Sequence, residues 1–180
     1  MRVLIPLAEG FEEIEFTTIV DILRRAGLDV VTAGLKPGLV EGRSKVKVMP
    51  DAALDDVRLA NFDAIVLPGG SPGFVNLGND ERVIKAVQEM DKAGKYVAAI
   101  CGAPSVLIKA GVLEGRRATV HPAGVDELAS CAQYVDERVV VDGKMVTSKA
   151  AGTAMEFALK LVEVLAGEDK VKKIQEDVLA

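Results

Sequence analysis

Short, continuous apolar runs alternate with helical segments along this chain. The clearest runs have the length of buried strands, and they cover residues 2–7, 28–33, 62–67 and 96–100. Residues 12–26 and 80–93 carry apolar side chains at helical spacing, and Gly27 and Gly94 follow them as stop residues. Because the strands show little internal alternation, the pattern predicts a largely parallel sheet covered by helices on both faces.

In the last third of the chain, the strand and helix patterns are shorter and less regular. Residues 138–141 and 145–147 flank Asp142-Gly143-Lys144, which indicates a β-hairpin. Residues 44–49 alternate Lys and Val, as in a half-exposed strand or a hairpin arm. Helical spacing returns at residues 152–166 and 168–179. No repeat or linker interrupts these elements, so we expect one α/β domain over residues 1–180.

Composition narrows the possible functions. The net charge is −5 and no Lys/Arg cluster interleaves with aromatic residues, so nucleic acid is not expected as the main partner. Two cysteines, Cys101 and Cys131, cannot form a disulfide framework. No apolar run approaches the length of a membrane span. The opening apolar stretch meets Glu9 too early for a signal peptide, which predicts a cytoplasmic protein in a reducing compartment.

Cys101 is the first candidate site residue. It ends an apolar strand, and Gly102-Ala103-Pro104 and a helical stretch follow it. A sharp strand-to-helix turn lifts a side chain out of a sheet, and a helix start beside the sulfur favours the thiolate. The alternative is an inert buried thiol, because cysteine is among the most buried residue types. Cys131, in 126–132, is interpreted as a packing residue near a helix end.

Glu15 is a carboxylate on the apolar face of the first predicted helix. On a wheel of about 100° per residue it lies about 40° from Ile19, inside the apolar arc. A buried carboxyl has a raised pKa and can shuttle a proton. The alternative is a first-turn acid that leans toward solvent and favours the helix dipole. Ile14 falls off the apolar arc, which suggests a dimer contact.

Three further positions carry possible chemistry. His121, the only histidine, follows a short strand-like segment, and any Cys–His arrangement must use it. Gly69 and Gly70 follow a buried strand, where bare backbone N–H groups could meet an oxyanion; the alternative is a tight turn. No nucleotide-binding glycine motif and no metal-ligand spacing is present, so no cofactor and no metal are expected.

Taken together, these segments resemble the ThiJ/PfpI superfamily, and most closely its Parkinsonism-associated deglycase branch. The resemblance covers nearly the whole chain. It rests on ordered motifs: EGFEEIE at 9–15, DILRRAG at 21–27, LPGG at 67–70, AAIC at 98–101, TVHP at 119–122 and TSKAAGT at 147–153.

The resemblance implies a flavodoxin-like three-layer sandwich that forms a homodimer. It also implies a role for each candidate residue. Cys101 would be the nucleophile on an elbow, Glu15 the protonated acid hydrogen-bonded to its sulfur, and His121 the nearby histidine. The oxyanion donors would be the backbone N–H groups of Gly70 and Gly102, with Gly69 shaping the loop.

The chain departs from two related branches. The protease-like branch places a histidine directly after the cysteine, where this chain has Gly102. Related amidotransferases use a later His-x-Glu, whereas His121 is followed by Pro122-Ala123. Neither an adjacent Cys–His dyad nor the amidotransferase triad can therefore form, which argues against an intracellular cysteine peptidase.

The resulting hypothesis is an enzyme that detoxifies small dicarbonyls such as methylglyoxal, giving lactate without glutathione, or that deglycates early glycation adducts of proteins. A reactive Cys101 thiolate would be the nucleophile. The alternative is a redox-sensing protective or chaperone protein in which Cys101 oxidises to the sulfinate. Both interpretations use the same residues, so the sequence leaves them open.

Overall fold

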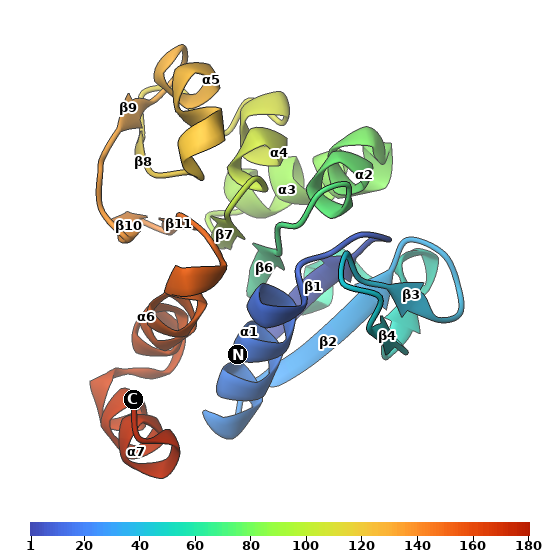
Figure 1. The fold of residues 1–180 in the computed structure, drawn as a ribbon, viewed down its shortest axis with the longest axis vertical. Helices are drawn as coiled ribbons and strands as arrows, with labels where there is room; N and C mark the ends of the chain where they lie inside the picture. The colour runs from blue at the N-terminus through green and yellow to red at the C-terminus, as the bar shows by residue number, and fades with distance from the viewer.

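A seven-stranded sheet forms the centre of the molecule (Figure 1). The structure is a computed structural model that describes residues 1–180. The strand order is β10-β11-β7-β6-β1-β2-β5, and all neighbours are parallel except the β10–β11 hairpin. The strands are β1 (Arg2–Leu7), β2 (Asp29–Gly34), β5 (Ala52–Ala53), β6 (Ala64–Leu67), β7 (Tyr96–Ile100), β10 (Val139–Asp142) and β11 (Met145–Ser148).

Helices cover both faces of this sheet and make a three-layer sandwich. On one face pack α1 (Glu13–Arg25), α6 (Ala154–Ala166) and α7 (Glu168–Val178). On the other face pack α2 (Gly73–Asn79), α3 (Glu81–Lys92), α4 (Pro104–Lys109) and α5 (Val125–Ala129). The predicted flavodoxin-like α/β fold is therefore confirmed.

The central strands are apolar throughout because both of their faces are buried. In β1, Val3 and Ile5 join the core beneath α1 and α6, whereas Leu4 joins the core beneath α3 and α4. In β6, Val66 and Ile65 divide between the two cores in the same way. Successive side chains of a strand point to opposite faces, so a strand between two helical layers needs apolar residues at every position.

Predicted helix ends and the hairpin agree with the structure. Gly27 and Gly94 have positive φ angles of 79° and 64° just past α1 and α3. Asp80 caps α3 by accepting from the Arg82 N–H, as its position predicts. Gly143, with φ 60°, turns β10 into β11.

Other boundaries differ from the sequence prediction. Within residues 44–49 only β4 (Lys47–Val48) is a strand, and it pairs with β3 (Val40–Glu41) in a hairpin outside the main sheet. The predicted helix at 152–166 begins with a 3-10 turn, so α6 starts at Ala154. A small parallel pair joins β8 (Arg117–Ala118) to β9 (Gln133–Tyr134). The 3-10 turns are Leu54–Asp56, Leu59–Asn61, Pro122–Gly124 and Ala151–Thr153.

The parallel strands bring several loops to one edge of the sheet. The carboxyl ends of β1, β6, β7 and β11 lie side by side, and the segments after Leu7, Leu67 and Ile100 leave from this edge. Parallel α/β sheets bind ligands at the carboxyl ends of their strands. None of the helices combines the length and apolar character needed to cross a membrane.

Candidate active site

Cys101 stands at a strained turn between β7 and α4. Its φ angle is 65°, in the left-handed region that non-glycine residues seldom adopt. Two backbone hydrogen bonds hold the turn: the Cys101 N–H donates to the Ser148 carbonyl at 2.9 Å, and the His121 N–H donates to the Cys101 carbonyl at 2.9 Å. The predicted sharp strand-to-helix turn at Cys101 is present, and it is fixed by segments that are distant in the sequence.

Glu15 lies directly beneath this turn. Its side chain is 0% exposed, so the buried position expected from the helical wheel is confirmed. Oε2 accepts the Gly69 N–H at 2.8 Å, whereas Oε1 is buried without a hydrogen-bond partner of good geometry. The carboxyl and the Cys101 side chain also perturb each other's pKa values. The alternative of an acid leaning toward solvent is therefore wrong.

Burial raises the pKa of Glu15 from its ordinary value of 4.5 to about 7. Hydrogen bonding to the Cys101 side chain and to the Gly69 N–H opposes this rise but is outweighed by desolvation. A carboxyl with a pKa near 7 carries a proton in about half of the molecules at neutral pH. Glu15 can therefore both accept and donate a proton under working conditions.

This raised pKa predicts how stability depends on pH. The folded state holds the Glu15 proton more tightly than the unfolded state, so the contribution to stability is complete below about pH 4.5 and is lost as the pH rises through about 7. The change from 4.5 to about 7 corresponds to ~3 kcal/mol at ~1.4 kcal/mol per tenfold change in proton affinity. As the pH rises from 4.5 to 8, the unfolding free energy of Glu15→Gln should rise by about that much relative to the unfolding free energy of wild type. Urea denaturation at each pH measures both values.

The control for this measurement is Glu81→Gln, which removes a carboxyl that is 89% exposed on α3. Its unfolding free energy should run parallel to that of wild type across the same pH range. A Glu15→Gln curve that also runs parallel to wild type would contradict the raised pKa of Glu15.

Glycines let the backbone approach the sulfur from two sides. The N–H groups of Gly70 and Gly102 interact with the Cys101 sulfur and favour its anion, and neither donates to a backbone carbonyl. A Cβ on Gly69 would lie 2.7 Å from both Glu15 Oε2 and the Cys101 Cβ. A Cβ on Gly70 would lie 2.2 Å from the Glu12 nitrogen, and Gly70 also has φ +92°. Only glycines fit at these positions.

The pKa of the Cys101 thiol differs from what the sequence predicts. Burial, followed by the charge of Glu15 and its hydrogen bond, raises the pKa of Cys101 to about 12. The two glycine N–H groups lower it, but by less than burial raises it. The helix start that was expected to favour the thiolate is therefore outweighed by burial. The sulfur needs a base, and the Glu15 carboxylate is in contact with it.

His121 enters from the loop after β8. Its Nδ1 accepts the Ala123 N–H at 3.2 Å, so in the neutral ring the proton is on Nε2. The ring lines the same cavity as Cys101. The structure thus brings Cys101 and His121 to one pocket and leaves the Nε2–H group of His121 as a donor. Cys131, in contrast, is half-buried just past α5, where its thiol donates to the Leu128 carbonyl at 3.6 Å, and it does not line this pocket.

The cavity above Cys101 has a volume of about 360 Å³. Its walls include residues that the sequence did not single out, namely Arg43, Phe74, Ser105 and Glu127. Arg43 comes from the loop between β3 and β4 and pairs with Glu12 at 3.3 Å. These residues belong to none of the motifs and come from one loop and three different helices, α2, α4 and α5, so no pattern in the sequence could have grouped them.

Comparison with known protein families matches the model of the DJ-1/PfpI family over residues 1–164. The chain belongs to the DJ-1/PfpI family. Protein dj-1beta of Drosophila melanogaster is 42% identical over 98% of this chain and 95% of its own length. Its crystal structure superposes with a TM-score of 0.96 at 41% identity, covering 99% of this chain and 97% of that one.

Two relatives have names that state an activity. The glutathione-independent glyoxalase DJR-1.2 of Caenorhabditis elegans is 37% identical over 92% of this chain and 89% of its own length. A deglycase of Pyrococcus abyssi is 38% identical over 92% of this chain and 99% of its own length. The family resemblance inferred from the motifs is confirmed, and the relatives' named activities are enzymatic.

Proposed function

We propose that this protein is a cofactor-free enzyme that uses Cys101 to convert small dicarbonyls such as methylglyoxal into hydroxyacids such as lactate, without glutathione. The same attack on an early glycation adduct would appear as deglycation. The observation that carries the proposal is the fully buried Glu15 carboxyl, with a pKa near 7, held against the sulfur of an elbow cysteine. The relatives named as a glyoxalase and a deglycase support the same chemistry.

The first step is addition of sulfur to the aldehyde carbon. The Glu15 carboxylate takes the Cys101 proton while the sulfur forms a bond to carbon, because the thiol itself is too weakly acidic to ionise alone. Electrons of the carbonyl double bond move to oxygen, where the N–H groups of Gly70 and Gly102 stabilise the negative charge. Return of the proton to this oxygen gives a neutral hemithioacetal and frees the Glu15 carboxylate.

The second step moves a proton between the two adjacent carbons. Glu15 removes the hydrogen from the carbon bonded to sulfur, and the electron pair forms an enediol with the neighbouring carbonyl. The Nε2–H group of His121 stabilises that carbonyl oxygen, since Nδ1 is already occupied. The hydroxyl proton on the first carbon then passes to the oxygen of the second carbon, Glu15 protonates the second carbon, and the oxygen of the first carbon closes to the carbonyl of a thioester. Water hydrolyses the thioester to the hydroxyacid and restores the thiol, so the balance is methylglyoxal plus water to lactate.

The proposal is tested by measuring lactate formed from methylglyoxal in buffer that contains no glutathione and no added metal. We expect lactate to accumulate in proportion to enzyme concentration, with repeated turnovers for each protein molecule. Mass spectrometry of the same sample should show Cys101 reduced. If reduced protein forms no lactate, the proposed enzyme activity is wrong.

We further propose that the protein forms a homodimer in which Ile14 is a contact. Ile14 is 58% exposed on α1, although it is a large apolar residue. A buried glutamate at a dimer contact is costly, so Ile14→Glu should shift the sedimentation coefficient from dimer to monomer. Leu179→Glu, the same change at a site that is 93% exposed, is the matched control and should remain dimeric. An Ile14→Glu protein that is still dimeric at low micromolar concentration would remove Ile14 from the interface.

A further inference from the structure

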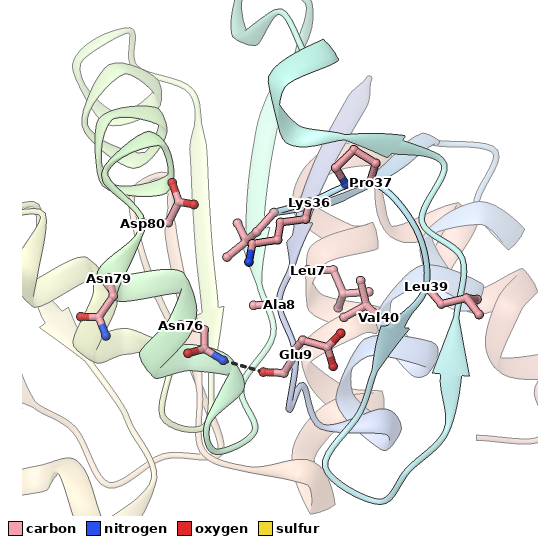
Figure 2. Close-up of a pocket in the computed structure, with 11 residues that line it drawn as sticks. Leu7, Ala8, Glu9, Lys36, Pro37, Leu39, Val40, Asn76, Asn79 and Asp80 are labelled. Atoms are coloured by element: carbon pink, nitrogen blue, oxygen red, sulfur yellow. Dashed lines mark hydrogen bonds between the residues drawn. The ribbon is translucent and has the colours of Figure 1, made fainter.

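A second cavity lies at the carboxyl edge of the sheet, on the side of β1 and β2. Its volume is about 340 Å³, within the range of small-molecule sites. We call it the β1–β2 cavity; it is lined by the end of β1 and the two residues after it, by the segment that leads from β2 into β3, and by the C-terminal end of α2 with Asp80 (Figure 2). It shares no lining residue with the pocket above Cys101. Helix α2 contributes Phe74 to the pocket above Cys101 and Asn76 to the β1–β2 cavity, so it forms part of the wall of each.

The position of this cavity follows from the strand order. The chain passes from β1 to β2 and β5 on one side, then returns to place β6 on the other side of β1. The order in which successive strands join the sheet therefore reverses at β1, and the loops after β1, β2 and β6 diverge there. In open α/β sheets this switch point is the place where crevices for ligands form.

Hydrogen bonds between its walls keep the cavity open. The Leu35 N–H donates to the Leu7 carbonyl at 3.0 Å, and the Asn76 side chain donates to the Glu9 carbonyl at 2.9 Å. Arg82 donates to the Leu35 carbonyl at 2.8 Å and pairs with Asp80 at 2.6 Å. Three separate segments are thus tied to one another without a ligand. A site formed in advance loses little conformational entropy on binding.

Two opposite charges, both exposed, line this cavity, and neither forms a salt bridge. Lys36 forms no salt bridge, although the neighbouring Asp80 is neutralised by Arg82. Glu9 also forms no salt bridge; its Oε2 accepts the Glu41 N–H at 2.9 Å, which leaves Oε1 free. Figure 2 shows Lys36 and Glu9 on two sides of one hollow, with Ala8 between them. They do not pair with each other, so a ligand can take both charges at once.

We propose that the β1–β2 cavity binds a small zwitterion of the amino-acid class, with its carboxylate on Lys36 and its ammonium group on Glu9. Charge-assisted hydrogen bonds of this kind are stronger than neutral ones and fix the orientation of the ligand. The apolar floor of Leu7, Ala8 and Val40 suits a short aliphatic side chain. This proposal is independent of the chemistry at Cys101.

The test is an amide chemical-shift titration of ¹⁵N-labelled protein with three matched probes: L-alanine, propionate and ethylamine. Propionate lacks the ammonium group of alanine, and ethylamine lacks its carboxylate. L-alanine should shift the amides of residues 7–9 and 35–40, and each truncated probe should bind about three- to tenfold more weakly. Lys36→Met and Glu9→Gln should each weaken alanine binding by a similar factor.

Two control variants locate the effect. Lys173→Met removes an exposed charge on α7 and should leave the alanine affinity unchanged, as should Cys101→Ala. Absence of shifts with L-alanine at millimolar concentrations would overturn the proposal. Equal binding of the three probes, or unchanged alanine binding in Lys36→Met and Glu9→Gln, would also overturn it. Shifts centred on Cys101 and not on residues 7–9 would assign the ligand to the other pocket.

Discussion

Replacing Cys101 with serine should abolish lactate formation from methylglyoxal. Serine keeps the size of the side chain, so the turn with φ 65° and its hydrogen bonds to Ser148 and His121 should persist. A hydroxyl is a far weaker acid than a thiol, and a carboxylate with a pKa near 7 cannot deprotonate it effectively. We expect turnover to fall by about a thousandfold or more, because the nucleophile and its base act as a unit. Lactate release measured under glutathione-free conditions checks this.

The matched control is Cys131→Ser. Cys131 is a free cysteine of intermediate exposure that follows α5 and does not line the pocket above Cys101. Its replacement should leave turnover within a factor of about two, since surface substitutions change stability little. Substantial lactate formation by folded Cys101→Ser, with an unfolding transition like that of wild type, would exclude Cys101 as the nucleophile.

The strands and helices of this fold were predictable where the signal is local. The run at 96–100 is apolar at each position because β7 is covered on both faces, and that pattern is visible without a structure. Helix α2 was not predicted, because Gly73, Gly78 and Asn79 make a seven-residue segment with weak helical propensity. Its helical form depends on packing against α3 and α4, which is tertiary and leaves no periodic signal.

The candidate site also has features that a local sequence pattern reveals and features that only the folded structure shows. Glu15 could be found because a charged residue on an apolar helical face contradicts the pattern around it. The pKa of Cys101 was predicted in the wrong direction, because the sequence shows the turn and the helix start but not the burial. Two groups that contact Cys101, the Glu15 carboxyl and the His121 N–H, are 86 and 20 residues away by the numbering. Desolvation is a property of the assembled site.

Replacing Glu15 with glutamine should remove most of the turnover while the fold remains intact. The amide has nearly the same shape and can still contact Gly69, but it can neither accept the Cys101 proton nor return one to carbon. Loss of a positioned general acid–base group costs about 10²- to 10⁴-fold in rate. Lactate formation at pH 7 measures the effect. Glu15→Asp retains a carboxyl on a shorter side chain, so it should recover part of the activity that Glu15→Gln loses.

Glu15→Gln also distinguishes the enzyme hypothesis from the redox-sensor hypothesis, since both assign roles to the same residues. Oxidation of the thiol by two equivalents of hydrogen peroxide gives a sulfinate and two waters, and this chemistry requires no proton shuttle between carbons. A glutamine amide can donate a hydrogen bond to the sulfinate oxygens, so Glu15→Gln should still form it, as mass spectrometry would show. Loss of turnover with sulfinate formation preserved assigns Glu15 to catalysis. Turnover that survives in Glu15→Gln would show that the proposed proton path through Glu15 is wrong.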